Sequence, residues 1–226
     1  MPNSDKLKKL FKNEGALDLA LTHRSWVNEH PNVRESNERL EFLGDAVLEF
    51  IVSKKLYETF PEKPEGFLTA LRANLVNTVN LSKVAKSLEV GKLLFLSKGE
   101  EDGGGRDNPT LLANTIEAII GAIYLDSGID GAYDFINKNI FADLSEKASE
   151  PLKDPKSILQ EEVQAQGYPA PKYVVVDEQG PDHAKNFTID VFVNGKALGK
   201  GAGKNKSEAA QNAAQEALSQ LETKSL

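Results

Sequence analysis

The stretch that decides the fold reads Asn37-Glu38-Arg39-Leu40-Glu41-Phe42-Leu43-Gly44-Asp45-Ala46-Val47-Leu48. In a helix, Glu38, Glu41 and Asp45 stand at i, i+3 and i+7, so their carboxylates share one narrow face. The opposite face carries the apolar residues expected in the core, which are Leu40, Leu43, Val47 and Ile51. The pattern therefore predicts an amphipathic helix that begins near residue 37, with Ser36 or Asn37 as its N-cap.

Three carboxylates on one face repel one another at neutral pH, and the sequence leaves two interpretations of them open. One is a solvated acidic surface; the other is a site for a hard divalent cation, which prefers oxygen ligands. Phe42 projects beside Glu38 rather than toward the apolar stripe. A large aromatic side chain there is either a peripheral core contact or an anchor for a partner, and we favour a subunit interface.

Composition limits the classes of protein to consider. The chain has 226 residues, enough for one large or two modest domains, and no cysteine, which excludes disulfides, thiolate metal sites and a cysteine nucleophile. The N-terminus is polar, and no segment approaches the length of a membrane span. We therefore expect a soluble, cytoplasmic protein without membrane contacts.

The net charge of −7 is unevenly distributed along the chain. Residues 1–151 hold 18 Lys and Arg against 24 Asp and Glu, whereas the remainder is nearly neutral with its lysines late. A charged stretch with two prolines, residues 145–155, is predicted to be a linker. We place one domain at residues 1–148 and a second at residues 154–223. Bound cations would let the acidic part meet a polyanion despite its charge.

The first domain is predicted to be entirely helical. The expected helices lie within residues 5–30 and at about 37–60, 65–79, 81–88, 111–125 and 129–147. Pro61 and Pro64 end the central helix. Residues 99–108 are glycine-rich but lack the Gly-Lys-Ser/Thr ending of a phosphate-binding P-loop, so we predict a flexible surface loop.

The helix over residues 111–125 carries the second group of polar candidates. Asn114 and Glu117 stand at i and i+3 in an otherwise apolar run, and Gly121 permits close approach of another helix. A carboxylate in such a run is costly to bury alone. We expect Glu117 to join Glu41 and Asp45; an exposed position at the helix edge is the alternative.

Two further residues have simpler explanations. His23 can serve as a ligand or general base, but a structural histidine near a helix end is the interpretation we favour. Glu65 is a lone carboxylate at the start of a helix, where interaction with the helix dipole is sufficient to explain it.

In the C-terminal part the spacing of the apolar residues changes from a helical repeat to alternation, and the pattern predicts an α-β-β-β-α domain. A helix near residues 158–163 precedes strands at about 173–177, 186–193 and 198–201, and a helix follows from 206 to 221. Asn194-Gly195 predicts a two-residue hairpin turn. Backbone N–H groups at the start of the last helix, with Lys204 and Lys206, predict an anion site suited to phosphates, and lysines that only solvate a loop are the alternative.

The stretch over residues 37–48 resembles the signature of ribonuclease III, an endonuclease specific for double-stranded RNA. The later stretch Leu112–Asp126 resembles the second helix of that family, and residues from about Asp154 resemble a double-stranded-RNA-binding domain. The resemblance covers nearly the whole chain. It implies an all-α nuclease domain that forms a homodimer, followed by a small α+β RNA-binding domain.

The resemblance also implies roles for particular side chains. Glu41, Asp45 and Glu117 would be catalytic metal ligands for Mg²⁺, with Mn²⁺ able to substitute, and Glu38 and Glu65 would be accessory acidic residues facing the RNA. Asn114 stands where many bacterial members have aspartate. An amide oxygen can coordinate Mg²⁺ directly or through water, but it brings no negative charge.

In the second domain the resemblance implies three RNA-contacting regions. Gln160 and Gln164 would reach the minor groove, and His183 would reach it one turn further on. Lys204 and Lys206 would hold phosphates across the major groove between them. Ser207 replaces a basic residue that many members have.

These implications predict a nuclease that hydrolyses duplex RNA with two metal ions. The products would carry 5′-phosphate and 3′-hydroxyl ends with short 3′ overhangs, and ribosomal, messenger and transfer RNA precursors are the expected substrates. One rival is a double-stranded-RNA-binding protein whose nuclease site is impaired by Asn114. Another is a metal phosphohydrolase for small molecules, which the RNA-binding domain argues against.

Overall fold

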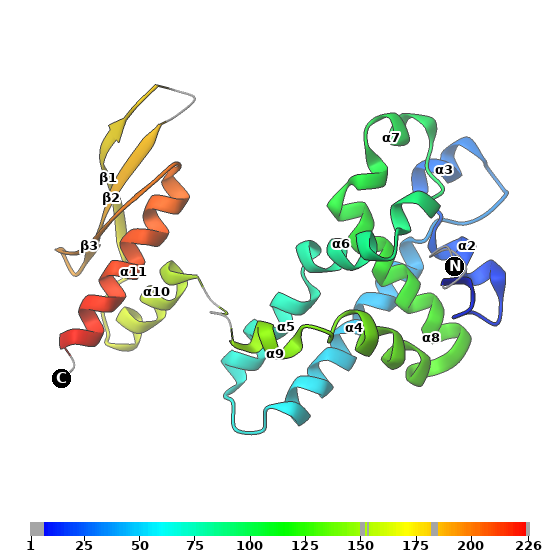
Figure 1. Cartoon of the computed structure of the whole chain (residues 1–226), viewed down its shortest axis with the longest axis horizontal. Helices are drawn as coiled ribbons and strands as arrows, with labels where there is room; N and C mark the ends of the chain where they lie inside the picture. Colours follow the sequence, from blue (N-terminus) through cyan, green and yellow to red (C-terminus); the bar gives the residue numbers. More distant parts are fainter. Residues whose placement is uncertain (1–6, 150–151, 153, 182–184, 225–226) are drawn as a thin grey trace. The chain divides into compact units, whose positions relative to one another are not determined.

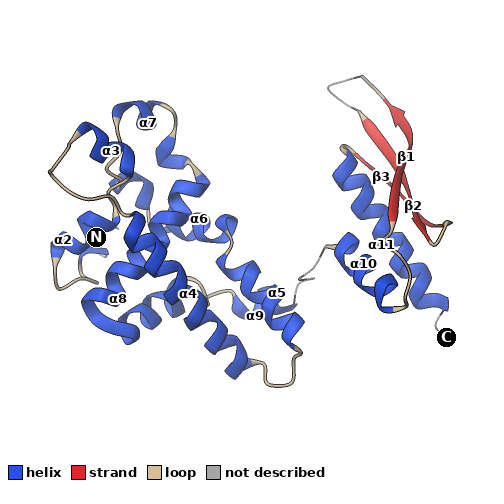
Figure 2. Cartoon of the chain, turned by 180° about the vertical axis from the view of Figure 1, so that it is seen from behind, coloured by secondary structure: helices blue, strands red, loops and turns tan. Residues whose placement is uncertain are grey.

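The computed structural model describes residues 7–149, 152, 154–181 and 185–224. The chain divides into two compact units, residues 1–152 and residues 153–226 (Figure 1). Within the described residues every strand belongs to the second unit, and the first unit is helical (Figure 2). In the described part of the chain, no helix has the length and apolar content needed to cross a membrane.

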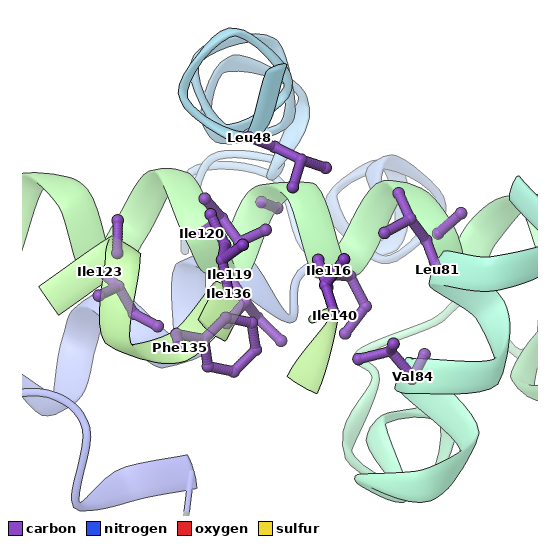
Figure 3. Close-up of a cluster of buried hydrophobic side chains, with 14 of the residues drawn as sticks. Leu48, Leu81, Val84, Ile116, Ile119, Ile120, Ile123, Phe135, Ile136 and Ile140 are labelled. Carbon is purple, nitrogen blue, oxygen red and sulfur yellow. The ribbon is translucent and has the colours of Figure 1, made fainter. Parts of the chain in front are cut away.

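The first unit is built around two long helices. Its elements are α2 (Glu14–Ala20), α3 (Arg24–Glu29), α4 (Glu38–Thr59), α5 (Glu65–Val76), α6 (Thr78–Ser87), the 3-10 helix η1 (Val90–Leu93), α7 (Lys98–Asp102), the 3-10 helix η2 (Gly105–Asp107), α8 (Pro109–Asn139) and α9 (Leu144–Ser149). The buried side chains of α8 form the centre of the core, with Leu48 of α4 and Leu81 of α6 packed around them (Figure 3).

Helices α4 and α8 cross with their backbones in contact. A Cβ atom added at Gly44 would lie 1.7 Å from the carbonyl oxygen of Glu117, and one added at Gly121 would lie 2.3 Å from that of Leu40. Only glycine permits this separation, because any side chain would overlap the facing backbone. The crossing fixes the α4 carboxylates beside the polar residues of α8.

The start of α4 differs from the predicted cap. Asn37 occupies the N-cap position, but its side chain makes no capping hydrogen bond. It instead donates to the carbonyl oxygen of Ala20 at 3.0 Å, and Ser36 donates to the Glu38 carboxylate. Asn37 is buried, so its amide group joins two segments of the chain rather than serving the helix end.

Other predictions for the first unit also need correction. Residues 99–108 are not an open loop, because α7 and η2 form there and Arg106 donates to the carbonyl oxygens of Gly91 and Leu94 at 2.9 and 3.1 Å. The helix predicted to reach residue 79 ends at Val76, since Asn77 is extended and caps α6.

The helix predicted at residues 129–147 ends at Asn139, and part of the predicted linker is helical. Helix α8 is interrupted at Gly128, whose φ of 74° lies outside the helical region. Its second half therefore starts near the predicted residue 129. Residues 144–149 then form α9, which is packed on the core through Leu144, so burial of an apolar residue extends the fold into the charged stretch.

The second unit has the predicted α-β-β-β-α order. It consists of α10 (Pro155–Ala165), β1 (Lys172–Gln179), β2 (Asn186–Val193), β3 (Lys196–Gly203) and α11 (Lys206–Lys224). The sheet is antiparallel in the order β1-β2-β3, and the helices cover one face of it (Figures 1 and 2). Asn194 and Gly195 both have positive φ, as the predicted hairpin turn requires.

Helix α11 packs directly on β3. A Cβ atom added at Gly201 would lie 2.1 Å from the backbone nitrogen of Ala213, and one at Gly199 would lie 2.4 Å from the Ala213 carbonyl oxygen. Alanines on the facing side of α11 are buried. This contact places the N-terminus of α11, with its lysines, at the end of β3.

Candidate metal and RNA-binding sites

A cavity of about 540 Å³ lies where α4 and α8 meet. Its polar lining comes from both helices and from the segment before α4: His23, Arg24, Asn37, Glu38, Glu41, Asp45, Asn114, Thr115 and Glu117. The polar residues of α4 point in one direction because of their helical spacing, and so do those of α8. The close approach of the two helices at Gly44 and Gly121 brings the two sets of side chains together. The structure thus brings Glu117 to Glu41 and Asp45.

The carboxylates of the cavity influence one another. Burial raises the pKa of Glu117 to about 7, and the charges of Asp45 and Glu41 contribute to the increase. Burial also raises the pKa of Glu41, with the charges of Glu38 and Asp45 adding to it, while a hydrogen bond from Asn114 opposes the change. A cation in the cavity would relieve this repulsion and favour the charged forms.

The donor set fits a hard divalent cation through its chemistry. Among the described residues, no three His, Cys, Asp or Glu side chains converge closely enough to form a metal site by themselves. Glu41, Asp45 and Glu117 nevertheless open into one cavity, and Asn114 adds an amide oxygen. Carboxylate and amide oxygens are the ligands that Mg²⁺ accepts, and bound waters usually complete its shell.

The residues at the cavity's edge have partners of their own. Glu38 accepts a hydrogen bond from Arg24 at 3.2 Å. The Nδ1 atom of His23 accepts from the backbone N–H of Ser25 and caps α3, which agrees with a structural role, although the ring also borders the cavity. Burial lowers the pKa of His23. Sequence reasoning missed Arg24, which no pattern near residue 24 distinguishes from other surface arginines.

Glu65 lies away from this group of side chains within the subunit. It begins α5 and accepts a hydrogen bond from Thr69 at 2.7 Å. A separate cavity of about 370 Å³ includes Glu65, Phe50 and Tyr57. The structure therefore does not bring Glu65 to Glu41 in one chain.

Helix α4 also presents large apolar side chains to solvent. Phe42 is 81% exposed, and Tyr57 and Phe50 are 74% and 59% exposed. Of the two interpretations of Phe42, a core contact is wrong. An aromatic side chain this exposed suits an interface with a partner.

The second unit presents its RNA-binding candidates on exposed positions. Gln160 and Gln164 are exposed and one turn apart on α10. Lys204 and Lys206 flank the start of α11, and both are exposed. His183 lies outside the described residues.

Comparison with known proteins identifies the chain's relatives. Residues 13–144 match the family model described as Ribonuclease-III-like, and residues 155–221 match the double-stranded RNA binding motif. The chain belongs to the ribonuclease III family. It is a hydrolase of the ribonuclease III class followed by a double-stranded-RNA-binding domain, which confirms the family and fold class predicted from the sequence.

Full-length relatives and a solved domain agree with this assignment. Ribonuclease 3 of Geobacillus sp. (strain WCH70) is 49% identical over 96% of this chain and 89% of the relative. Ribonuclease 3 of Oceanobacillus iheyensis is 45% identical over 97% of both chains. The nuclease domain of ribonuclease III from Campylobacter jejuni is 41% identical, with a TM-score of 0.56, and the match covers 61% of this chain and 95% of that domain.

Proposed function

We propose that this chain cleaves double-stranded RNA with divalent metal ions held in the α4–α8 cavity. The observation that carries the proposal is the meeting of Glu41, Asp45 and Glu117 in one cavity, where burial, with a contribution from the charges of Asp45 and Glu41, raises the pKa of Glu117 to about 7. Mg²⁺ is the proposed metal and Mn²⁺ its substitute. We take residues 1–148 as the nuclease domain and residues 154–223 as the RNA-binding domain.

The side chains divide the work of phosphodiester hydrolysis. When bound, two divalent ions supply an activated water, charge neutralisation at phosphorus and stabilisation of the leaving oxygen. Glu41, Asp45 and Glu117 provide anionic oxygen ligands. A hydrogen bond between Asn114 and Glu41 lowers the pKa of the Glu41 carboxyl, and the amide oxygen of Asn114 would be its atom for a metal ion or a bound water. No nucleophile from the protein is required, and the products carry 5′-phosphate and 3′-hydroxyl ends.

The active form is proposed to be a homodimer that uses the Phe42 region. The exposed aromatic side chains of α4 support this, as does the Campylobacter jejuni nuclease domain, which has a region involved in dimer formation. Each subunit would cut one strand and leave a short 3′ overhang. Glu65, which lines a different cavity from Glu41 in its own chain, would face the RNA as an accessory acidic residue.

The second domain is proposed to hold the duplex by its shape. Gln160 and Gln164 would contact minor-groove hydroxyls and base edges, while Lys204 and Lys206 would contact phosphates. His183 completes the proposed set. Because A-form shape carries little sequence information, sequence preference should be modest, and structured precursors of ribosomal, messenger and transfer RNA in the cytoplasm are the proposed substrates.

The test is cleavage of a long RNA duplex and of a single strand of the same sequence, each with Mg²⁺ and with a chelator. We expect cutting of the duplex only, and only with the metal, with end mapping that gives 5′-phosphates and 3′ overhangs. Asn114 favours one other function, a binding protein with an impaired nuclease site. Duplex binding without cutting in Mg²⁺ or Mn²⁺ would establish that alternative.

A further inference from the structure

The lysine at the start of α11 is already engaged by an acidic residue of the same unit. The Nζ atom of Lys206 lies 3.3 Å from Oε1 of Glu178 on β1. The Nζ atom of Lys185 lies 3.9 Å from the other oxygen of that carboxylate. One glutamate thus neutralises charge on two lysines that flank the loop between β1 and β2 and the N-terminus of α11.

The strand register holds this arrangement in place. Glu178 is directly opposite Phe187 in the β1–β2 pairing, and Phe187 is opposite Gly203 of β3. The Lys206 ammonium group lies 5.4 Å from the centre of the Phe187 ring. Because the strand pairing holds Glu178 beside Phe187, the Glu178 carboxylate and the Phe187 ring both lie close to the Lys206 ammonium group.

Lys204 provides the contrast on the same surface. Its backbone N–H group donates to Glu208 at 2.8 Å, but within the described residues its ammonium group has no ion pair. Two lysines only two positions apart therefore differ in how readily they can meet a phosphate. Lys204 can do so at once, whereas Lys206 must exchange Glu178 for the phosphate.

We propose that Glu178 competes with RNA phosphates for Lys206 and Lys185, and so sets the duplex affinity of this domain below what its lysines would give. The proposal rests on the proposed function, since it assumes that these lysines face RNA. The side chains of Glu178 and Lys206 are 40% and 62% exposed, and exposed ion pairs of this kind are weak. The competition therefore tunes affinity and does not block binding.

The test compares Glu178→Gln with Asp177→Asn in the full chain. Asp177 is the adjacent exposed acid on β1, and its carboxylate accepts a hydrogen bond from Gln179. Both variants lose one negative charge at adjacent positions of β1, whose side chains point to opposite faces of the sheet, but only Glu178→Gln removes the ion pair of Lys206. Binding to a short RNA duplex is measured in a chelator, which prevents cleavage, over a series of salt concentrations.

We expect Glu178→Gln to bind about two- to fivefold more tightly than both the parent and Asp177→Asn. Its affinity should also fall more steeply with salt, by up to about 0.9 in the logarithmic slope, because Lys206 no longer has its ion pair with Glu178. In the Glu178→Gln background, Lys206→Ala should weaken binding about two- to fivefold more than it does in the parent.

Two results would overturn the proposal, and a third would refute the function on which it rests. Equal gains in both variants would mean that only overall charge matters. Weaker binding by Glu178→Gln would mean that Glu178 holds Lys206 in position for the phosphate. A parent that binds no duplex would instead refute the proposed RNA-binding function, and the comparison of the variants separates that failure from the first two.

Discussion

Both units bring two elements into backbone contact at glycine residues, but the sites beside these contacts differ in their exposure to solvent. In the first, Gly44 and Gly121 bring the backbones of α4 and α8 into contact; in the second, Gly199 and Gly201 do so for β3 and α11. The first contact leaves Glu41 and Glu117 half-buried, although Asp45 is exposed, and burial raises the pKa of Glu117 to about 7. The second leaves lysines exposed at the end of a helix.

This difference follows from what each site is proposed to hold. A metal ion is bound best by fixed oxygen atoms partly withdrawn from water, whose repulsion the cation relieves. A long phosphate backbone requires charges that reach into solvent and exchange partners at low cost. In each unit a backbone contact at glycines therefore fixes where the polar side chains lie. The solvent exposure of those side chains then determines whether they suit a metal ion or a phosphate backbone.

The largest effect is expected from Gly44→Ala, which would force the Cβ atom to within 1.7 Å of the Glu117 carbonyl oxygen. We expect a loss of about 3 kcal/mol or more in the free energy of unfolding, because α4 and α8 must separate. Urea unfolding followed by the fluorescence of Trp26, the single tryptophan, reports on this unit. Gly66→Ala is the control, since nothing lies within 4 Å of its added Cβ atom. Equal stability of both variants would contradict the close contact.

The next largest effect is expected from Glu117→Gln, which removes one of the proposed anionic ligands and keeps the shape of the side chain. We expect the rate of duplex cleavage in Mg²⁺ to fall by more than about a hundredfold, since even residues behind the ligands contribute up to about that much. Duplex binding in a chelator should be unchanged, because the RNA-binding candidates of the second unit are untouched. Retained turnover would refute the role of Glu117.

Phe42→Ala tests the exposed face of α4. Because Phe42 is 81% exposed in the single chain, we expect little change in the stability of the monomer. The dimer should weaken by about 2 kcal/mol, or about thirtyfold in its dissociation constant, as for a central aromatic anchor. Sedimentation equilibrium measures this. Val79→Ala, which truncates a side chain 63% exposed on α6, is the control, and equal dimerisation of both variants would exclude Phe42 from the interface.

A smaller effect is expected in the pH dependence of stability without metal. The pKa of Glu117 is about 7 in the folded chain, above its value of about 4.3 in an unfolded chain. The folded state therefore binds more protons in this interval, so stability should fall as pH rises from about 4.5 to 7.

The parent and Glu117→Gln, compared by urea unfolding in a chelator, isolate this contribution. From pH 5 to pH 8 the parent should lose about 1–2 kcal/mol relative to the variant, a figure reduced for the partial exposure of Glu117. Mg²⁺ at pH 8 should restore stability to the parent more than to the variant. A constant difference between the two proteins across pH would mean that burial and the neighbouring carboxylates do not raise the pKa of Glu117.

Local geometry accounts for what the sequence could predict. The i, i+3, i+7 spacing places Glu38, Glu41 and Asp45 on one face without knowledge of any other element. The hairpin at Asn194-Gly195 follows equally from local backbone preferences. These features depend on residues close together in the chain, and the structure has them where they were expected.

Long-range contacts account for what the sequence could not predict. The order of residues 99–108 depends on Arg106, which donates hydrogen bonds to carbonyl groups 15 and 12 residues earlier in the chain. Asn37 bonds to Ala20 instead of capping its helix, and the early end of the second half of α8 at Asn139 carries no proline or glycine signal. The meeting of Glu117 with Glu41 was predicted from the cost of burying a lone carboxylate, but the geometry depends on the backbone contact at Gly44.

The most direct test of the central claim, that the α4–α8 cavity is a working metal centre with Asn114 in it, is a cleavage assay. A long RNA duplex is incubated with Mg²⁺ and either this chain or Asn114→Asp, and initial rates are compared. We predict that this chain cuts at a rate within about tenfold of the Asp variant, because three carboxylates remain and the amide oxygen replaces the fourth ligand. Cleavage by the Asp variant alone would contradict the claim and leave this chain as an RNA-binding protein with an impaired nuclease site.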